Sequence, residues 1–254
     1  METGLTGRKA LVTGASRGIG RAIAASLAGE GCALALCARG EEGLRQAAKE
    51  LSETGARVYA EPVDVADAGA LEGFVRRSAQ ELGGLDIVVS NVSAGASKSP
   101  EQWENSFRGD LMAFVRLVEA ALPYLEESDA ASVVAIGTTN AVDTARPASP
   151  NAYSAVKAAV LYHASALAHA LAPKGIRVNT VSPGPIEFAG GAWSQIREHR
   201  PEVYEEVLGK LPIGRYGRPE DVAAAVTFLA SPLAGFCAGV NLVVDGGLVT
   251  RVQT

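Results

Sequence analysis

The sequence predicts an α/β fold, a doubly wound parallel sheet of about seven strands with helices on both faces. Short apolar segments rich in β-branched residues alternate with longer Ala-rich segments of helical period. The apolar segments are nearly continuous, as expected for strands that helices cover on both sides. No linker, low-complexity tract or internal repeat divides the 254 residues. Residues 1–254 are therefore predicted to form one dinucleotide-binding and catalytic domain.

The predicted strands recur at regular intervals along the chain. They cover 9–14 (KALVTG), 33–38, 57–62, 86–91, 132–137, 176–181 and 241–246. Helices are predicted between them at 18–30, 41–54, 67–82, 101–127, 151–172 and 219–230. Strict alternation of strand and helix is typical of a parallel sheet, because each crossover needs a helix to return the chain.

One segment, 184–214, interrupts this alternation between the sixth and seventh strands. It begins with Gly and Pro and carries Phe188, Trp193 and Tyr204. Connections of this length are commonly functional. The segment is predicted to be a lid over a substrate site, and a solvated excursion is the alternative.

Composition excludes several classes of partner. Hydrophobic residues make up 48% and charged residues 20%, and the net charge is −5 without a basic block. Nucleic acid and anionic membrane are therefore not expected as partners. The amino terminus lacks a signal-like apolar segment, and no apolar run approaches the ~20 residues of a membrane span. Cys32, Cys37 and Cys237 form no CxxC pair, so a cytoplasmic protein without a metal site or disulfide is expected.

A glycine-rich loop follows the first strand. The segment LVTGASRGIGRAIA (11–24) places Gly14, Gly18 and Gly20 between a strand and a helix. Glycines permit the tight turn and let backbone N–H groups approach a pyrophosphate at the helix N-terminus. This context predicts a dinucleotide site, with Ser16 and Ile19 beside the glycines, rather than an ordinary turn.

A second motif lies in the segment NAYSAVKAAV, where Tyr153 and Lys157 are four residues apart and share a helix face. With the GxxxGxG loop, this Tyr-x-x-x-Lys pair and VVDGG at 243–247 in order, the chain resembles the short-chain dehydrogenase/reductase family. Members similar to 3-oxoacyl carrier-protein reductases show the same motifs. The resemblance implies a Rossmann-type fold, a nicotinamide cofactor and a catalytic Tyr153–Lys157 pair. It also implies a homo-oligomer, tetramer or dimer, that uses helices 101–127 and 151–172 and the last strand.

The second strand ends at Ala38 and Arg39, without the carboxylate that commonly binds the 2′-hydroxyl of NAD. Arg17 in the glycine loop is expected nearby. Two guanidinium groups suit a 2′-phosphate, so NADP(H) is predicted and NAD is the less favoured cofactor. Glu41 and Glu42 are expected to open the next helix, where acidic residues are favourable.

The resemblance implies further cofactor contacts. They are Asp64 and Val65 near the adenine, Asn91 after the fourth strand, Pro183, Gly184 and Ile186 after the sixth, and Tyr153 and Lys157 near the nicotinamide ribose. Asp64 has an alternative role as a cap of the following helix.

The tyrosine–lysine pair has a chemical rationale. A free tyrosine has a pKa near about 10, too high for an efficient acid–base group at neutral pH. A neighbouring ammonium favours the phenolate and lowers that pKa, so Tyr153 is expected to exchange the proton and Lys157 to tune it. Thr138 stands where the family has a serine that binds the substrate oxygen, with Thr139 beside it. The alternative is that both threonines only cap a turn.

Other positions depart from the family pattern. Asp110 falls where the family has an asparagine, and an ionised carboxylate only accepts hydrogen bonds. It could pair with Lys157 and weaken its effect on the tyrosine, or relay protons itself. Phe188 replaces a threonine that contacts the cofactor. The substrate pocket is expected to comprise Val92, Ser93, Thr139, Phe188 and Trp193.

These features predict an NADP(H)-dependent oxidoreductase that interconverts a ketone and a secondary alcohol. The departures at Asp110, Thr138 and Phe188 motivate an alternative, a cofactor-binding sensor or assembly subunit with little catalysis. A small free carbonyl or alcohol is the favoured substrate. The acidic stretch LEESDAAS argues against docking of an acidic carrier protein, although Lys174 is available nearby.

Overall fold

The computed structural model describes residues 2–97, 99–144 and 151–250. In this part of the chain seven parallel strands form one sheet in the order β3-β2-β1-β4-β5-β6-β7. The strands are β1 (Lys9–Thr13), β2 (Ala33–Ala38), β3 (Val58–Pro62), β4 (Ile87–Ser90), β5 (Ser132–Ile136), β6 (Arg177–Pro183) and β7 (Asn241–Val244). Each lies within two residues of its predicted position, so the predicted strands and the parallel sheet are confirmed.

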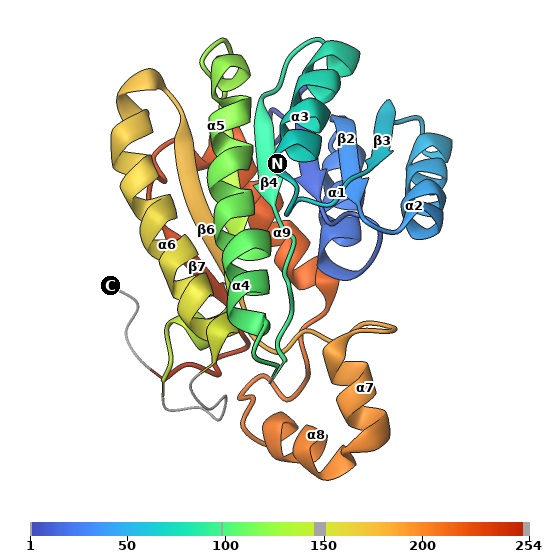
Figure 1. Cartoon of the computed structure of the whole chain (residues 1–254), viewed down its shortest axis with the longest axis vertical. Helices are drawn as coiled ribbons and strands as arrows, with labels where there is room; N and C mark the ends of the chain where they lie inside the picture. Colours follow the sequence, from blue (N-terminus) through green and yellow to red (C-terminus); the bar gives the residue numbers. More distant parts are fainter. Residues whose placement is uncertain (1, 98, 145–150, 251–254) are drawn as a thin grey trace.

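Helices cover both faces of the sheet (Figure 1). On one face lie α3 (Ala68–Leu82), α5 (Ala113–Leu125) and α6 (Ala152–Leu171), whose buried residues form one core with the strands. On the other face lie α1 (Gly18–Gly29), α2 (Glu41–Glu53) and α9 (Pro219–Ala230), which share a second core. Short 3-10 turns occur at η2 (Thr139–Ala141), η3 (Ala172–Lys174) and η4 (Pro232–Ala234). The α/β fold class with helices on both faces is confirmed.

The order of the strands reverses at β1. This strand pairs with β2 on one side and with β4 on the other, with Leu11 opposite Ala35 and Val88. Chain segments leaving β1 and β4 therefore diverge toward opposite faces and leave a crevice at their carboxyl ends. Ligands of open α/β sheets bind at such a switch point.

The helix predicted at 101–127 has an interruption. It comprises α4 (Gln102–Ser106), a π-helical turn η1 (Phe107–Met112) and α5, which run on as one rod (Figure 1). Within the π turn, Gly109 and Asp110 are buried. A π turn accommodates an extra residue in the helix and often occurs at functional sites. Apolar periodicity over a long window does not register such a local change in helical repeat.

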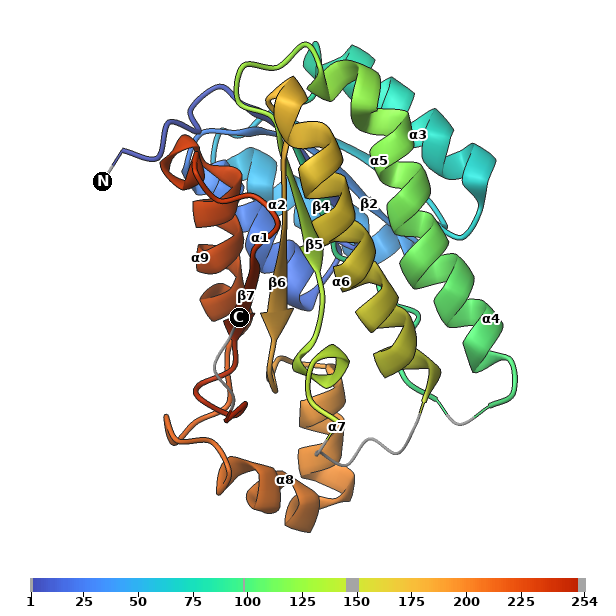
Figure 2. The ribbon, with the colours of Figure 1, turned by 90° about the vertical axis from the view of Figure 1, so that its left-hand side faces the viewer.

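The predicted lid contains two helices, α7 (Ala192–His199) and α8 (Pro201–Leu208), which extend beyond the carboxyl ends of the strands (Figures 1 and 2). Two backbone hydrogen bonds pin its base, from Glu187 N to Gly217 O at 2.8 Å and from Gly217 N to Pro185 O at 3.0 Å. Residues of the segment pack in a small apolar cluster together with Tyr216 and Leu248, which lie beyond its end. That cluster contains Leu211, Tyr216 and Leu248, packed by Trp193, Tyr204, Val207 and Leu208.

One helical segment, Ala152–Lys174, is long and apolar enough by composition to cross a membrane. Core helices of soluble proteins meet the same criterion, and α6 packs along β6 and against the π turn. Only 33% of its most apolar stretch is buried within one chain, so part of its apolar surface faces outward.

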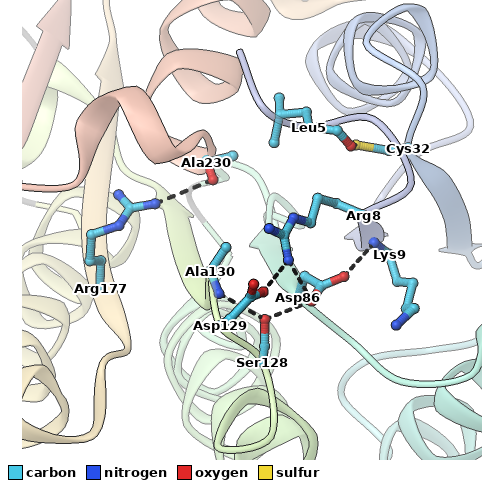
Figure 3. Close-up of polar contacts among 10 residues, drawn as sticks. All are labelled: Leu5, Arg8, Lys9, Cys32, Asp86, Ser128, Asp129, Ala130, Arg177 and Ala230. Atoms are coloured by element: carbon cyan, nitrogen blue, oxygen red, sulfur yellow. Dashed lines mark hydrogen bonds and ion pairs between the residues drawn. The ribbon is translucent and has the colours of Figure 1, made fainter. Parts of the chain in front are cut away.

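Polar contacts at the opposite, amino edge of the sheet join loops that are distant in sequence (Figure 3). The Asp86 carboxylate accepts hydrogen bonds from Lys9 N at 2.8 Å and from Ser128 Oγ at 2.6 Å. Arg8 forms ion pairs with Asp86 at 3.8 Å and with Asp129. These bonds fix the starts of β1 and β4 against the loop that enters β5.

Arg177, at the start of β6, holds the end of α9 (Figure 3). Its guanidinium donates to the carbonyl oxygens of Leu229 at 2.7 Å, Ala234 at 3.1 Å, Ser231 at 3.1 Å and Ala230 at 3.3 Å. The last carbonyls of a helix have no partner within the helix, and a cation near them is favourable. Arg177 thus joins the sheet to the helix that packs against α1.

We expect Arg177→Met to lower the free energy of unfolding by about 3 kcal/mol, because four carbonyl oxygens lose a charged donor that methionine cannot replace. Equilibrium denaturant unfolding measures this loss. Arg57→Met is the matched control, since the exposed Arg57 donates to one carbonyl, that of Glu81. Equal losses of stability in the two variants would contradict this prediction, because the four hydrogen bonds of Arg177 would then stabilise the fold no more than the one hydrogen bond of Arg57.

Candidate active site

The glycine loop joins β1 to α1 in a conformation that side chains would block. Gly14 and Gly18 have positive φ angles of 68° and 55°. A Cβ atom on Gly20 would lie 2.2 Å from Gly14 O, so only glycine allows this close approach of helix to strand. The first turn of α1 also has no side-chain cap, because the N-cap residue Arg17 makes no capping bond. Its free N–H groups suit a pyrophosphate.

Asn91 braces this loop from β4. Its side-chain amide donates to Thr13 O at 3.1 Å and to Gly14 O at 3.2 Å, and its backbone N–H donates to Thr13 Oγ1 at 3.0 Å. The amide thus lies next to the cofactor loop, as the sequence indicated, and it supports the conformation of the loop.

A cleft of 770 Å³ opens at the carboxyl ends of β1 to β4, at the strand-order reversal. It has the size of ligand sites in general, and its neighbours include both arginines expected to select the cofactor. The predicted residues that line it are Gly14, Ser16, Arg17, Ile19, Gly20, Arg39, Asp64, Val65, Asn91, Val92, Ser93 and Phe188. The glycine loop, the strand ends and Phe188 of segment 184–214 therefore surround one cleft.

The two arginines differ in their surroundings. Arg39 is exposed at the cleft and makes no hydrogen bond or ion pair with the described residues. Arg17, also exposed, donates from Nη1 to Gly190 O at 3.0 Å, which ties the glycine loop to the lid. The sequence predicted Arg17 only as a phosphate ligand and gave no sign of this bond to a residue 173 positions away.

Phe188 lies directly on the glycine loop. A Cβ atom on Gly18 would be 2.5 Å from a Phe188 ring atom, and one on Gly191 would be 3.0 Å away. The ring therefore fills space that two glycines leave free, between the cofactor loop and the lid. It offers an apolar surface to the cleft where a threonine would offer a hydroxyl.

Asp64 lines the cleft and does not cap the following helix. Its Oδ1 accepts from Ala66 N at 3.0 Å, in a local turn, whereas Asp67 caps α3 by accepting from Ala70 N at 3.0 Å. The alternative role that the sequence allowed for Asp64 is therefore wrong. Glu41 and Glu42 do open α2, as predicted.

Tyr153 lies in the first turn of α6, half-buried beside the end of β5. Asn151 begins this helix, and its side chain accepts from Ser154 N at 2.8 Å. The Thr138 hydroxyl lies near the Tyr153 phenol and lowers its pKa. Thr138 also accepts a hydrogen bond from Asn140 N at 3.3 Å and so caps the η2 turn. Its hydroxyl therefore lies beside the phenol and also caps the turn, which was the alternative role. Thr139 is buried at the start of that turn.

Lys157 lies one turn further along α6 and is buried. Its Nζ donates to Ile136 O at 3.0 Å and to Val92 O at 3.4 Å, and it lies 3.2 Å from Asp110 Oδ1. The second oxygen of Asp110 accepts from Ala94 N at 3.3 Å. Of the two roles open to Asp110, pairing with the lysine is the one present in this structure.

The pKa of Tyr153 is shifted in the direction opposite to the sequence-based expectation. Burial raises the pKa of the phenol, the Thr138 hydroxyl lowers it, and the charge of Asp110 raises it further, with a net upward shift. The expected net lowering of this pKa is therefore wrong for this structure, and burial is the largest cause. The weakening of the lysine effect that the sequence allowed for Asp110 agrees with the direction of the shift.

Several predicted residues lie away from the cleft. Trp193 packs within the lid, with its ring centroid 5.1 Å from that of Tyr216, and does not line the cleft. Ile186 is buried in the second core and borders a different hollow beside Val244. Pro183 and Gly184 also lie outside the cleft wall, at the end of β6. Gly184 passes so close to Asp245 that a Cβ would lie 2.7 Å from the Asp245 Cβ.

The sequence missed part of the cleft wall. Ala94, Asn105, Arg108 and Gly109 line it from the loop after β4 and from α4 and its π turn. Arg108, two residues before Asp110, adds a third guanidinium to the cleft. Its position could have been inferred only from the change in helical repeat at the π turn.

Comparisons with known proteins agree with this geometry. Residues 14–249 match the family model described as enoyl-(acyl carrier protein) reductase. The chain is 40% identical to an isoepoxydon dehydrogenase of Penicillium expansum, covering 100% of this chain and 99% of the relative. It is 33% identical to a 3-oxoacyl-[acyl-carrier-protein] reductase of Vibrio cholerae, covering 96% and 98%.

Solved structures are similar over nearly the same length. A short-chain oxidoreductase of Pseudomonas aeruginosa with NADPH bound and an atypical catalytic center has a TM-score of 0.87 and 32% identity, covering 96% of this chain and 98% of that one. The L-sorbose reductase of Gluconobacter frateurii complexed with NADPH and L-sorbose has a TM-score of 0.89 and 30% identity, covering 99% and 100%. With its glycine loop, its Tyr153–Lys157 pair and these relatives, the chain belongs to the short-chain dehydrogenase/reductase family of oxidoreductases.

Proposed function

We propose that this protein is an NADPH-dependent reductase that interconverts a small ketone and a secondary alcohol, with Tyr153 as the acid–base group. The observation that carries the proposal is the Tyr153 phenol on the same helix as the buried Lys157 and near the Thr138 hydroxyl, at the carboxyl edge of the sheet, in a chain whose glycine loop suits a dinucleotide. NADPH, when bound, supplies the hydride.

The residues around the cleft fit such a cofactor. The uncapped first turn of α1 and the glycines at 14, 18 and 20 would hold the pyrophosphate. Arg39 and the remaining donors of Arg17 would bind the 2′-phosphate, and Asp64 and Val65 would lie beside the adenine. Related proteins that were solved with NADP or NADPH support this assignment.

The chain's own residues would handle the proton. The Tyr153 hydroxyl donates its proton to the carbonyl oxygen during reduction and accepts it back from the alcohol during oxidation. Thr138, which lies near the phenol, is placed to orient the same substrate oxygen. Lys157 would act through its charge and through the ribose hydroxyls of the cofactor. The substrate would meet Val92, Ser93 and Phe188 at the cleft and Thr139 beside Thr138.

A small free carbonyl fits the surface better than a carrier-protein thioester does. Lys174, near the start of β6, is paired with Glu126 at 2.6 Å, and Asp129 is paired with Arg8. Neither leaves a basic patch for an acidic carrier protein. The isoepoxydon dehydrogenases, at 40% identity, favour the same choice.

A homo-oligomer, tetramer or dimer, would cover the remaining apolar surface. Tyr162 on α6 is 79% exposed, and Phe236 beside the last strand is fully exposed. Trp103, Phe107, Phe228, Leu233 and Val240 add exposed apolar area on or next to the same elements. Apolar surface of this extent on paired helices is typical of subunit interfaces.

For the reaction itself, Tyr153→Phe should reduce kcat by about 10²–10⁴-fold while the protein still binds NADPH, because the variant loses the transferable proton and keeps the aromatic ring. Turnover of a panel of small cyclic and acyclic ketones, followed by NADPH oxidation, gives kcat. A wild-type protein that binds NADPH but turns over nothing would favour the sensor or assembly subunit instead.

For the cofactor, Arg39→Ala should weaken NADPH binding by about tenfold or more and leave NADH binding unchanged, since only NADPH carries the 2′-phosphate. Titration of nicotinamide fluorescence measures both affinities. Arg45→Ala is the control, as this exposed arginine pairs with Glu41 on α2 outside the cleft. A wild-type preference for NADH would contradict the assignment.

For the assembly, the native mass in solution should be two or four times 26.1 kDa by light scattering. Tyr162→Glu or Phe236→Glu should lower that mass, because a charge would be buried in the interface. Ile213→Glu, at an exposed apolar residue near the end of segment 184–214, should leave the mass unchanged. A wild-type monomer would refute the oligomer.

A further inference from the structure

Asp110 occupies an unusual place for a carboxylate. Its side chain is fully buried in the π turn between α4 and α5. The π turn directs it toward α6, whereas its neighbour Arg108 reaches the cleft wall. A buried carboxylate is costly unless it is paired, so its contacts indicate what it does.

Those contacts connect three segments of the site. Asp110 Oδ2 accepts from Ala94 N in the loop after β4, and Oδ1 faces the Lys157 ammonium on α6 at 3.2 Å. Among the described residues Oδ1 accepts no hydrogen bond, so charge attraction is what holds it to the lysine. The carboxylate therefore fixes the position of the lysine relative to the loop that lines the cleft.

The Lys157 ammonium has three hydrogens and three close acceptors from the protein. These are Asp110 Oδ1, Ile136 O at 3.0 Å and Val92 O at 3.4 Å. The two carbonyl oxygens accept hydrogen bonds from the ammonium, and Asp110 Oδ1 faces it as an ion pair. Of the three contacts, the one to Val92 O is the longest and the easiest to exchange for a ribose hydroxyl.

Burial is the largest cause of the raised pKa of Tyr153; the Thr138 hydroxyl at the end of β5 lowers this pKa, and Asp110 on the π turn raises it further. Segments near the start of α6 also carry the charged residues Asp143, Glu104 and Arg108. β5 carries no charged side chain.

We propose that Asp110 is a positioning residue that holds the Lys157 ammonium on the protein and thereby keeps the Tyr153 phenol protonated, the form that reduces a carbonyl, across neutral pH. This inference rests on the proposed function and adds that the site favours reduction of the carbonyl over oxidation of the alcohol at neutral pH. An uncharged asparagine at the same place would leave the ammonium unneutralised, and the phenol would ionise more readily.

The chemistry balances as follows. In reduction the carbonyl carbon gains a hydride, which NADPH supplies as it becomes NADP⁺, and the carbonyl oxygen takes the Tyr153 proton. Water then reprotonates the phenolate. In oxidation the phenolate must form first, so the oxidation rate at low substrate rises about tenfold for each pH unit below the pKa of Tyr153. Reduction needs no such ionisation and stays constant through neutral pH.

The ionisation can be measured without cofactor or substrate. The near-ultraviolet absorbance of phenolate is recorded against pH for the wild-type protein and for Tyr153→Phe, and the difference isolates Tyr153. We expect Tyr153 to ionise above the value of about 10 for a free tyrosine. Ionisation at or below pH 8 in the wild-type protein would overturn the proposal and does not depend on any Asp110 variant folding.

The decisive variant is Asp110→Asn, whose side-chain oxygen can still accept from Ala94 N. We expect Tyr153 to ionise about one pH unit or more lower than in the wild type, and oxidation at pH 7 to become about tenfold faster relative to its alkaline plateau. Glu104→Gln is the control, because it removes one negative charge from the neighbouring, exposed face of α4. Thermal melting verifies that both variants are folded.

The outcomes separate the two proposals. If the Asp110→Asn variant is folded and its Tyr153 ionises at the wild-type pH, Asp110 has only a structural role, even when turnover proves the reductase. An equal shift in Glu104→Gln would also overturn the inference, since it would reflect net charge. If no ketone is turned over by the wild type, the reductase fails, and the absorbance titration still decides how Asp110 acts on Tyr153.

Discussion

The site depends on the contact between the end of β1 and the start of α1. Gly20 lies so close to Gly14 that no side chain fits between them, and Asn91 fastens the same turn to β4. This contact fixes the position of the first turn of α1 and the direction in which its unpaired N–H groups point. The cleft, the neighbouring strand ends and the lid contact at Phe188 are all arranged around that point. A methyl group at position 20 would separate helix from strand and remove the geometry that the other residues share.

The two edges of the sheet use charge differently. At the amino edge, Asp86 and Arg177 are bonded to several backbone groups, and these bonds hold strands and loops in place. At the carboxyl edge, charges either reach solvent, as Arg39 does, or are buried in a single pair, as Lys157 and Asp110 are. Bonds to backbone are specific in position and rigid. A buried carboxylate instead adds to the raised pKa of the Tyr153 phenol, of which burial is the largest cause.

Local sequence signals predicted what depends on local physics. Strand positions followed from apolar runs, the glycine loop from its strand–turn–helix context, and the Tyr153–Lys157 face from a spacing of four. The tertiary contacts were not predictable in this way. The bond from Arg17 to Gly190, the packing of Trp193 inside the lid and the π turn that buries Asp110 each join segments far apart or alter the helical repeat locally. The direction of the Tyr153 pKa shift was mispredicted because its largest cause is burial of the phenol, which a spacing of four residues does not reveal.

Arg17 joins the glycine loop to segment 184–214 through one side-chain hydrogen bond. A guanidinium carries five N–H donors in a planar fork, and one of them reaches Gly190 O. The others remain for a phosphate, so a single side chain can bond to the lid and to a nucleotide together. Phe188 provides the matching apolar contact, since its ring rests on Gly18 at the base of the same loop. Segment 184–214 is therefore attached to the glycine loop by one polar and one apolar contact, and its aromatic residues pack with Tyr216 and Leu248 in one small cluster.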